Sequence, residues 1–328
     1  METSLVAVVG GDTLLAKEIR EVLGESQPSP RVQLIAAGDR DPSEPGAEED
    51  DAVVMAPLTR ESLAGARVAF LAGSAASSRR THKLNGPGGV TLIDLTSALE
   101  EQPEARLRAP TAEPGTAERG ARIQVIAHPA AIALAMFLRR VAETGAIRQT
   151  VVHVFEPASE RGQRGLTELQ QQTVAVLAFK KLKTEVFDAQ LGFNVLARYG
   201  EEALEPLEGI EGRLERHLAS LLAEWPGIPM PSLRLIQVPV FHGHSFSAWV
   251  EFEKHQNAEA LARALADAGL DVRAEDPPSN AGIAGQSGLS AGAIAVDRNN
   301  PRAVWFWLVA DNLRLSAENA VQAAREVL

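Results

Sequence analysis

Short apolar runs that alternate with helix-like segments are the feature that most constrains how this chain folds. The run LVAVVGG, residues 5–11, ends in two glycines and is followed by the helical pattern TLLAKEIREVL, residues 13–23. This order predicts a strand, a tight turn and a helix. Further β-rich runs occupy residues 31–38, 67–73, 90–95 and 122–128. Strands separated by crossovers favour a parallel, doubly wound sheet, so we expect a Rossmann-like α/β domain over residues 1–130.

The pattern changes after Pro129, where strands and helices no longer alternate strictly. Helix-like runs cover residues 132–145, 166–182 and 258–270, and strand-like runs cover 150–157, 233–254 and 304–311. The alternation within 233–254 suits long antiparallel strands. We therefore expect an α+β domain over residues 131–308. The closing segment, 309–328, contains the helical pattern AENAVQAAREVL and is expected to return to the first domain.

Composition excludes several classes of function. The formal net charge is -11, with 43 acidic residues and no basic run, which argues against nucleic acid or an anionic membrane as partner. No apolar stretch reaches the roughly 20 residues of a membrane span, and the N-terminus lacks the basic region of a signal peptide, so a cytoplasmic protein is expected. The chain has no cysteine, which excludes disulfides, thiolate metal sites and thiol nucleophiles.

The first turn retains only part of a dinucleotide fingerprint. Gly10 and Gly11 are present, but Asp12 and Thr13 follow where further glycines are usual. Asp12 disfavours a pyrophosphate, whereas the helix N-terminus still offers amides, and either residue could simply cap the helix. NADP or NAD binding and a plain structural turn both stay open. Gly73 and Ser74, after the run at 67–73, form a second turn of the same kind or an ordinary loop.

Several blocks in order resemble the aspartate-β-semialdehyde dehydrogenase family. They are VAVVGG, LIDLTSAL, IAHPAA, FNV, QVPVFHGHS and VADNLRLSAENAVQ, and they span nearly the whole chain. The resemblance implies an NADP-binding first domain, a second domain with the active site and the dimer interface, and reductive dephosphorylation of β-aspartyl phosphate. It adds Asn312 and Arg40 to the cofactor-binding candidates. Arg40 favours the 2′-phosphate of NADP and Asp41 disfavours it, so the choice between NADP and NAD stays open.

The chain departs from the family pattern at the residues that carry its chemistry. Only the base position, His244, matches. The family's nucleophilic cysteine, glutamine, substrate-binding arginine and phosphate-binding arginine correspond to Ala131, Glu156, Gln237 and Glu100. Deletion of a nucleophile typically costs a factor on the order of 10⁴ to 10⁶ in turnover. We therefore expect the thiol reaction to be lost.

Three functions remain after this loss. The first is a dimeric pseudoenzyme that binds a nucleotide or modulates a partner. The second is an oxidoreductase or lyase that uses His244 and Glu156 without a covalent intermediate. The third is a structural subunit that pairs with a paralogue.

Other residues have two interpretations each. His242 and His244, two apart on an expected strand, could be metal ligands, but an inherited histidine beside an unrelated neighbour is favoured and no metal is predicted. His128 and His153 could join His244 and Glu156 in an acid–base site or a satisfied polar pocket. Trp305 and Trp307 suit a strand buried on both faces or a dimer contact. Residues 170–172, three glutamines, are expected to be solvated.

Overall fold

The computed structural model describes residues 4–25, 27–38, 54–114 and 120–328. These residues form two compact units, Met1–Ala127 with Ser316–Leu328, and His128–Leu315. The loop predicted at Asp39–Asp51, and with it Arg40 and Asp41, lies outside the described residues. Within the described residues, no helix has the length and apolar character that crossing a membrane requires. The domain bounds at 130 and 308 stay a prediction.

The first unit is built on a parallel six-stranded sheet with the order β2-β1-β3-β4-β6-β5. Its strands are β1 (Leu5–Val9), β2 (Arg31–Ile35), β3 (Val68–Leu71), β4 (Thr91–Asp94), β5 (Ala105–Arg108) and β6 (Ile123–Ile126), and its helices are α1 (Leu14–Gly24), α2 (Arg60–Leu63) and α3 (Ala75–Asn85). The predicted doubly wound α/β arrangement is confirmed. The strand β5 was not predicted, because its sequence ARLR at the sheet edge lacks an apolar run.

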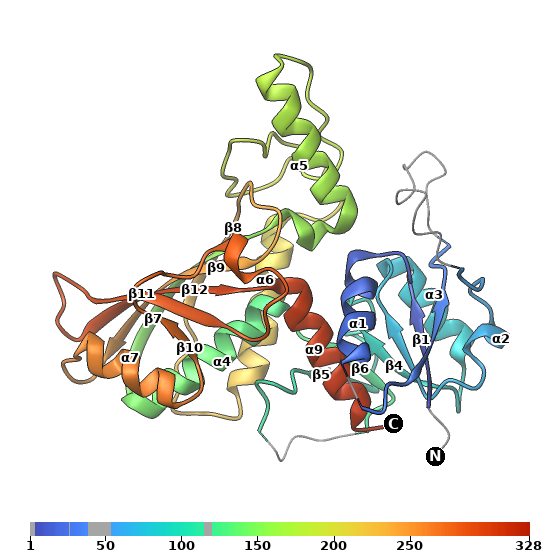
Figure 1. Cartoon of the computed structure of the whole chain (residues 1–328), viewed down its shortest axis with the longest axis horizontal. Helices are drawn as coiled ribbons and strands as arrows, with labels where there is room; N and C mark the ends of the chain where they lie inside the picture. Colours follow the sequence, from blue (N-terminus) through green and yellow to red (C-terminus); the bar gives the residue numbers. More distant parts are fainter. Residues whose placement is uncertain (1–3, 26, 39–53, 115–119) are drawn as a thin grey trace. The chain divides into compact units, whose positions relative to one another are not determined.

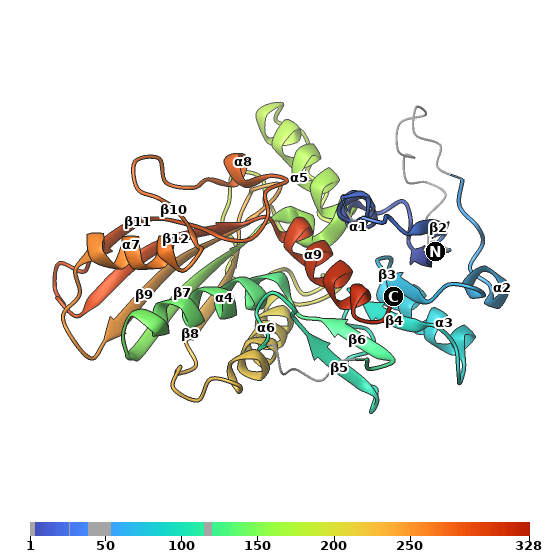
Figure 2. The ribbon, with the colours of Figure 1, turned by 60° about the horizontal axis from the view of Figure 1, so that its bottom comes forward.

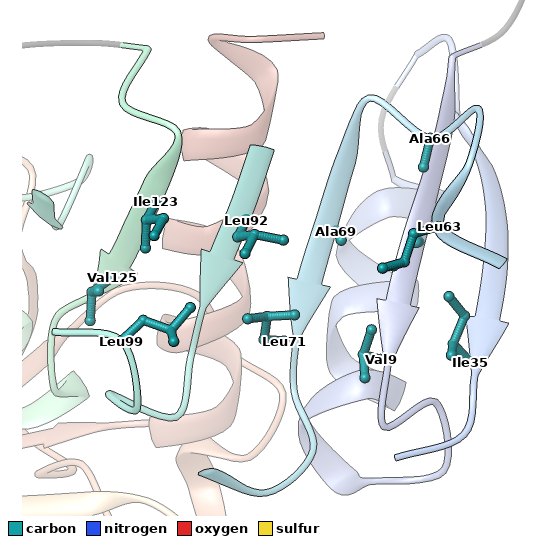
Figure 3. Close-up of a cluster of buried hydrophobic side chains, with 11 residues drawn as sticks. Val9, Ile35, Leu63, Ala66, Ala69, Leu71, Leu92, Leu99, Ile123 and Val125 are labelled. Atoms are coloured by element: carbon teal, nitrogen blue, oxygen red, sulfur yellow. The ribbon is translucent and has the colours of Figure 1, made fainter. Parts of the chain in front are cut away.

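One face of this sheet carries a continuous apolar core. Figure 3 shows Val9, Ile35, Leu71, Leu92 and Val125 on neighbouring strands, with their side chains gathered on the same side of the sheet. All four residues of β3 are buried, as expected for a central parallel strand that is covered on both faces.

The C-terminal helix α9 (Asn312–Arg325) belongs to the first unit from Ser316 onward. Asn319 Oδ1 accepts hydrogen bonds from the backbone nitrogen and the hydroxyl of Thr111, both at 3.0 Å. Glu326 forms an ion pair with the buried Arg108 at 2.8 Å. The predicted return of the C-terminal helix to the first domain is confirmed.

The second unit contains a mixed six-stranded sheet with the order β10-β11-β12-β9-β7-β8 (Figures 1 and 2). Its strands are β7 (Ile147–Glu156), β8 (Ser232–Gln237), β9 (His244–Phe252), β10 (Asp271–Arg273), β11 (Ser290–Val296) and β12 (Ala303–Ala310), and its helices are α4 (Pro129–Thr144), the 3₁₀ helix η2 (Ala158–Arg161), α5 (Gly162–Leu177), α6 (Leu207–Leu222), α7 (Ala258–Asp267) and α8 (Asn280–Ile283). The helix α4 contacts α6 and α7 along one face of the sheet (Figure 2). The predicted α+β class is confirmed.

The prediction of antiparallel strands within 233–254 holds for β9, which is antiparallel to β7 and β12, and is corrected for β8. The strands β8 and β9 are not partners: both border β7, and β8 runs parallel to it. The physical reason is the connection between β7 and β8, which includes α5 and α6 and returns the chain to the same end of the sheet before β8 begins.

The prediction of a strand buried on both faces at Trp305 and Trp307 was wrong, and the alternative of a dimer contact stays a prediction. Trp305 is 39% exposed, whereas Phe306 is buried, so β12 is buried on one face there. The indole of Trp305 donates to Asp297, which explains why this large side chain is stable at the surface. Of the three glutamines expected to be solvated, Gln170 and Gln171 are exposed, but Gln172 is buried, and its side-chain oxygen accepts from the backbone nitrogens of Leu191 and Gly192.

Candidate functional site

The turn between β1 and α1 brings two glycine turns of the first unit into close contact. Gly10 has φ +83°, and a Cβ atom there would lie 2.5 Å from the Cα atom of Gly73. A Cβ at Gly73 would in turn meet the Ser77 hydroxyl at 2.6 Å. Both positions therefore require glycine for their conformation or their space. The backbone nitrogens of Gly10 and Gly11 donate to Ile35, so these two amides stabilise the turn itself.

Helix capping shows which of the two residues after the glycines caps α1. Thr13, and not Asp12, is the N-cap of α1: its hydroxyl accepts from the backbone nitrogen of Ala16 and donates to the carbonyl of Ala72. Ser74 caps α3 in a reciprocal capping box with Ser77. The amides at the first positions of α1 and α3 precede the intrahelical bonds and suit the pyrophosphate of a dinucleotide. The residues present thus fit NADP or NAD at these two helix starts.

In the second unit, His128, Glu156 and His244 form one buried cluster. His128 precedes α4, Glu156 ends β7 and His244 begins β9. Glu156 Oε2 lies 3.9 Å from His128 Nε2 and 3.7 Å from His244 Nε2. The two imidazole rings have centroids 5.6 Å apart. The fold therefore places three chemically active groups, which are far apart in the sequence, within contact of one another.

Charged partners surround this cluster. Arg161 Nη2 donates to Glu156 Oε1 at 2.9 Å, and Arg161 Nη1 contacts Glu205 at 3.3 Å. Glu160 Oε2 lies 3.8 Å from His128 Nε2. Asn312, which was predicted to bind a cofactor, donates from Nδ2 to Glu160 Oε1 at 2.7 Å and accepts from the backbone nitrogen of Gly243. The Asn312 side chain thus joins η2 to the segment that leads into β9.

Burial and charge shift the pKa values of the cluster in different directions. Burial alone would raise the pKa of Glu156, but His244, Arg161 and His128 outweigh it and hold that pKa at about 2. Burial lowers the pKa of His128 well below its usual value, although Glu156 opposes the shift. Burial, together with the nearby Glu156 charge, raises the pKa of Glu160. Glu156 is therefore the permanent anion of the cluster, and His128 is neutral at pH 7.

The altered family positions are occupied by mutually bonded or inert groups. Ala131 is completely buried in the first turn of α4, where its methyl group has no chemistry to offer. Gln237 Nε2 donates to the backbone oxygen of Glu156 at 2.8 Å, and the hydroxyl of Tyr199 donates to Gln237 Oε1 at 2.6 Å. Glu100 lies half-buried in the turn that follows β4 in the first unit.

Two histidines that the sequence singled out lie outside the cluster. His153 lies within β7, where it pairs with Ser247, and is half-buried. His242 precedes β9 and is not on the strand, so the expected pair of histidines on one strand face is wrong. Among the described residues, the group with the geometry of a metal site is His128, Glu156 and His244, with ligand atoms within 4.8 Å of one another.

Sequence reasoning missed Arg161, Glu160 and His217. Arg161 and Glu160 follow Glu156 by five and four positions in the segment EPASER. Charged residues directly after the end of a predicted strand could have indicated them. His217 lies in α6, which was not predicted as a helix. Its Nδ1 accepts from the backbone nitrogen of His128 at 2.9 Å.

Comparison with known proteins agrees with the family resemblance seen in the sequence and with the two-unit fold. Residues 138–315 match the model of the semialdehyde dehydrogenase dimerisation domain. A relative from Pseudomonas aeruginosa, described as a USG-1 protein homolog, is 29% identical and covers 96% of this chain and 95% of its own. The solved structure of a probable aspartate-semialdehyde dehydrogenase from Pseudomonas aeruginosa has a TM-score of 0.82 at 27% identity, covering 99% and 98% of the two chains. An enzyme structure with NADP from Candida albicans shares the fold, with a TM-score of 0.67 at 16% identity and coverage of 100% and 98%.

The fold and the cluster define a two-unit α/β protein with a dinucleotide-type first unit and a buried polar site in the second. The chain belongs to the semialdehyde dehydrogenase family.

Proposed function

We propose that this chain is a family member that has lost thiol catalysis and functions by binding a nicotinamide dinucleotide without covalent chemistry. Such a protein is a pseudoenzyme with respect to the family reaction, acting as a nucleotide-binding or partner-modulating subunit. The observation that carries the proposal is that the altered family positions hold groups unsuited to the reaction, beginning with Ala131, which is buried and has no nucleophile. Arg161 neutralises Glu156, and Gln237 is bonded to Tyr199 and to the backbone of Glu156.

The electrostatics of the cluster support the loss of the acyl-phosphate reaction. Glu156 ionises with a pKa of about 2 and places a negative charge at the position that would face the anionic substrate. Ala131 cannot form the acyl intermediate, and the 328-residue sequence contains no cysteine to replace it. Without a nucleophile, His244 has no thiol to activate.

The first unit supports retention of the cofactor. The glycine contact between Gly10 and Gly73 is maintained, and Thr13 and Ser74 cap the two helices whose first amides would hold the pyrophosphate. When bound, the nicotinamide group would supply hydride-transfer chemistry. The chain's own contribution is to bind and orient the dinucleotide at these two turns.

A nucleotide titration tests this proposal. We expect NADP or NAD to raise the melting temperature, because a ligand at 100 times its dissociation constant adds about 2.7 kcal/mol of stability. We expect no turnover of β-aspartyl phosphate by the unaltered chain, and none by Ala131→Cys, because Glu156 and Gln237 remain. Turnover by the unaltered chain would refute the loss of catalysis. Absence of any nucleotide-induced shift would refute the binding function and favour the structural subunit.

A second candidate function uses the cluster itself. The 3.7 Å separation of His244 and Glu156 favours an oxidoreductase or lyase that moves a proton without a covalent intermediate. Loss of a measured turnover in His244→Ala, with retained turnover in His242→Ala, would support this second function over a pseudoenzyme.

We further propose that the chain acts in the cytoplasm as a homodimer. The match to the dimerisation domain supports this assembly, as do exposed apolar side chains on α5 and the following segment, namely Val174, Leu177, Phe179, Phe193 and Val195. Light scattering of the purified chain is expected to give the mass of two chains. A single-chain mass would contradict the homodimer and leave pairing with a paralogue as the alternative.

A further inference from the structure

The buried cluster combines two imidazoles and one carboxylate from three separate elements. His128, Glu156 and His244 are 8%, 0% and 1% exposed. Their ligand atoms lie within 4.8 Å of one another, and the two nitrogen–oxygen distances are 3.9 and 3.7 Å. In tetrahedral zinc sites, bonds of about 2.0–2.2 Å place ligand atoms about 3.3–3.6 Å apart. Small side-chain movements would therefore bring these three atoms to ligand distance around one ion.

The hydrogen bonding of the cluster is incomplete. Among the described residues, seven buried side-chain atoms have no hydrogen-bond partner, and four of them are His128 Nε2, Glu156 Oε2 and both ring nitrogens of His244. Buried polar atoms are almost always satisfied, and each unsatisfied one costs about 1–3 kcal/mol. His128 Nε2, Glu156 Oε2 and His244 Nε2 lie close together, and one ion between them would satisfy all three atoms.

We propose that His128, Glu156 and His244 bind one Zn²⁺ ion. A mixed set of imidazole and carboxylate ligands suits this ion. A single ion also needs only the space between the three ligand atoms, whereas an organic ligand would need a cavity. The proposal concerns the second unit alone and is independent of nucleotide binding by the first.

Neighbouring residues orient the ligands. Arg161 binds Glu156 through Oε1 and leaves Oε2 directed at the histidines. Because Arg161 also contacts Glu205, its positive charge is shared with a second carboxylate. Glu160 Oε2, 3.8 Å from His128 Nε2, is the candidate for the fourth position, and Asn312 fixes its other oxygen. Such outer contacts are typical of metal centres.

Metal binding requires a change of tautomer at His128. His128 Nδ1 accepts a bond of 3.2 Å from the backbone nitrogen of Ala130, so in the neutral ring Nε2 carries the proton. Zinc at Nε2 would move this proton to Nδ1 and break the bond to Ala130. The Ala130 amide is buried, so losing this partner costs about 1–3 kcal/mol, which the metal–ligand bonds would have to offset. The amide resonance of Ala130 should therefore shift when zinc is added.

The test uses the full-length chain after treatment with a chelator. We expect calorimetry to show one Zn²⁺ per chain, and Co²⁺ to give the intense visible absorption of a four-coordinate site. His244→Gln and His128→Gln should each weaken binding by more than about 10-fold, the smallest loss typical of altered metal partners. His242→Ala, a histidine two residues from His244 but outside the cluster, is the matched control and should bind as the unaltered chain does.

Several outcomes would overturn the proposal. They are less than one ion per chain at saturation, a Co²⁺ spectrum typical of six-coordinate hydrated ion, or equal losses in His242→Ala and His244→Gln. Circular dichroism of each metal-free variant establishes that it is folded. Should a histidine variant fail to fold, the Co²⁺ spectrum and the Ala130 resonance of the unaltered chain still decide the question. A failed nucleotide titration would leave these readouts unchanged.

Discussion

Two completely buried carboxylates, one in each unit, show how differently the two halves of this chain treat charge. Asp94 in the first unit accepts from the backbone nitrogen and hydroxyl of Thr96 and from the backbone nitrogen of Leu99, at 2.9, 2.6 and 2.8 Å. Burial outweighs these neutral donors and raises the pKa of Asp94. Glu156 in the second unit faces Arg161, and its pKa is about 2.

The pKa values of Asp94 and Glu156 differ because their hydrogen-bonding and charged partners differ, since both carboxylates are completely buried. Neutral donors organise the turn after β4 but stabilise the ionised form of Asp94 too little to offset desolvation. His244, together with the Arg161 cation at 2.9 Å, reverses that balance for Glu156. Asp94 therefore shapes a turn, whereas Glu156 belongs to a buried cluster of ionised and titratable groups.

The largest effect is expected when the cation of the second unit is removed. Arg161→Met should lower the free energy of unfolding by about 3–5 kcal/mol, because Glu156 would remain as a buried and uncompensated charge. Urea denaturation at neutral pH in the presence of a chelator measures this loss.

The double variant provides the control. Glu156→Gln with Arg161→Met removes both charges and should recover much of the lost stability, since neutral pairs of similar size often replace buried ion pairs without net cost. An exposed ion pair contributes up to about 1 kcal/mol. A smaller change than this in Arg161→Met would contradict the claim that Arg161 compensates the buried charge of Glu156.

The fold of the first unit was largely predictable because its strands are short apolar runs that end in glycine. The runs at 5–11 and 67–73 became β1 and β3, and both are buried as central strands must be. The prediction failed where burial did not leave an apolar pattern. The strand β5 has two arginines in four residues, and Arg108 is buried only because Glu113 and Glu326 neutralise it.

The sequence predicted several residues of the site but not the contacts between them. His244 and Glu156 were named from the sequence, and His128 was a considered neighbour, because a family resemblance aligned them with a site. Arg161 and Asn312 acquired their contacts only through the folding of η2 against the approach to β9. Contacts between residues 152 or more positions apart, such as Asn312 with Glu160, leave no local pattern.

A smaller loss of stability is expected when the close contact between Gly10 and Gly73 in the first unit is disturbed. Gly10→Ala places a Cβ 2.5 Å from Gly73 at φ +83°, so we expect a loss of about 1–3 kcal/mol and of nucleotide binding. Gly24→Ala is the matched control: its Cβ meets nothing within 4 Å at the end of α1, and it should gain up to about 1 kcal/mol. Equal nucleotide affinity in both variants would show that the turn does not form the cofactor site.

The smallest expected effect is on how the free energy of unfolding depends on pH. A carboxyl group in the first unit and one in the second should change this dependence with opposite signs. Because the folded pKa of Asp94 is raised above 3.8, its contribution to stability is complete below that value and is lost as the pH rises through the folded pKa. One proton limits this slope to about 1.4 kcal/mol per pH unit. Asp94→Asn should remove this slope from urea denaturation curves measured at several pH values above 3.8.

Asp271 in the second unit provides the opposite sign. A hydrogen bond from Ser290 lowers its pKa, with a further contribution from Arg273, so its contribution is present above 3.8 and is lost as the pH falls. Asp271→Asn should therefore make the protein less sensitive to acid, whereas Asp94→Asn should make it less sensitive to rising pH. Two variants with slopes of the same sign would contradict the raised pKa of Asp94 or the lowered pKa of Asp271.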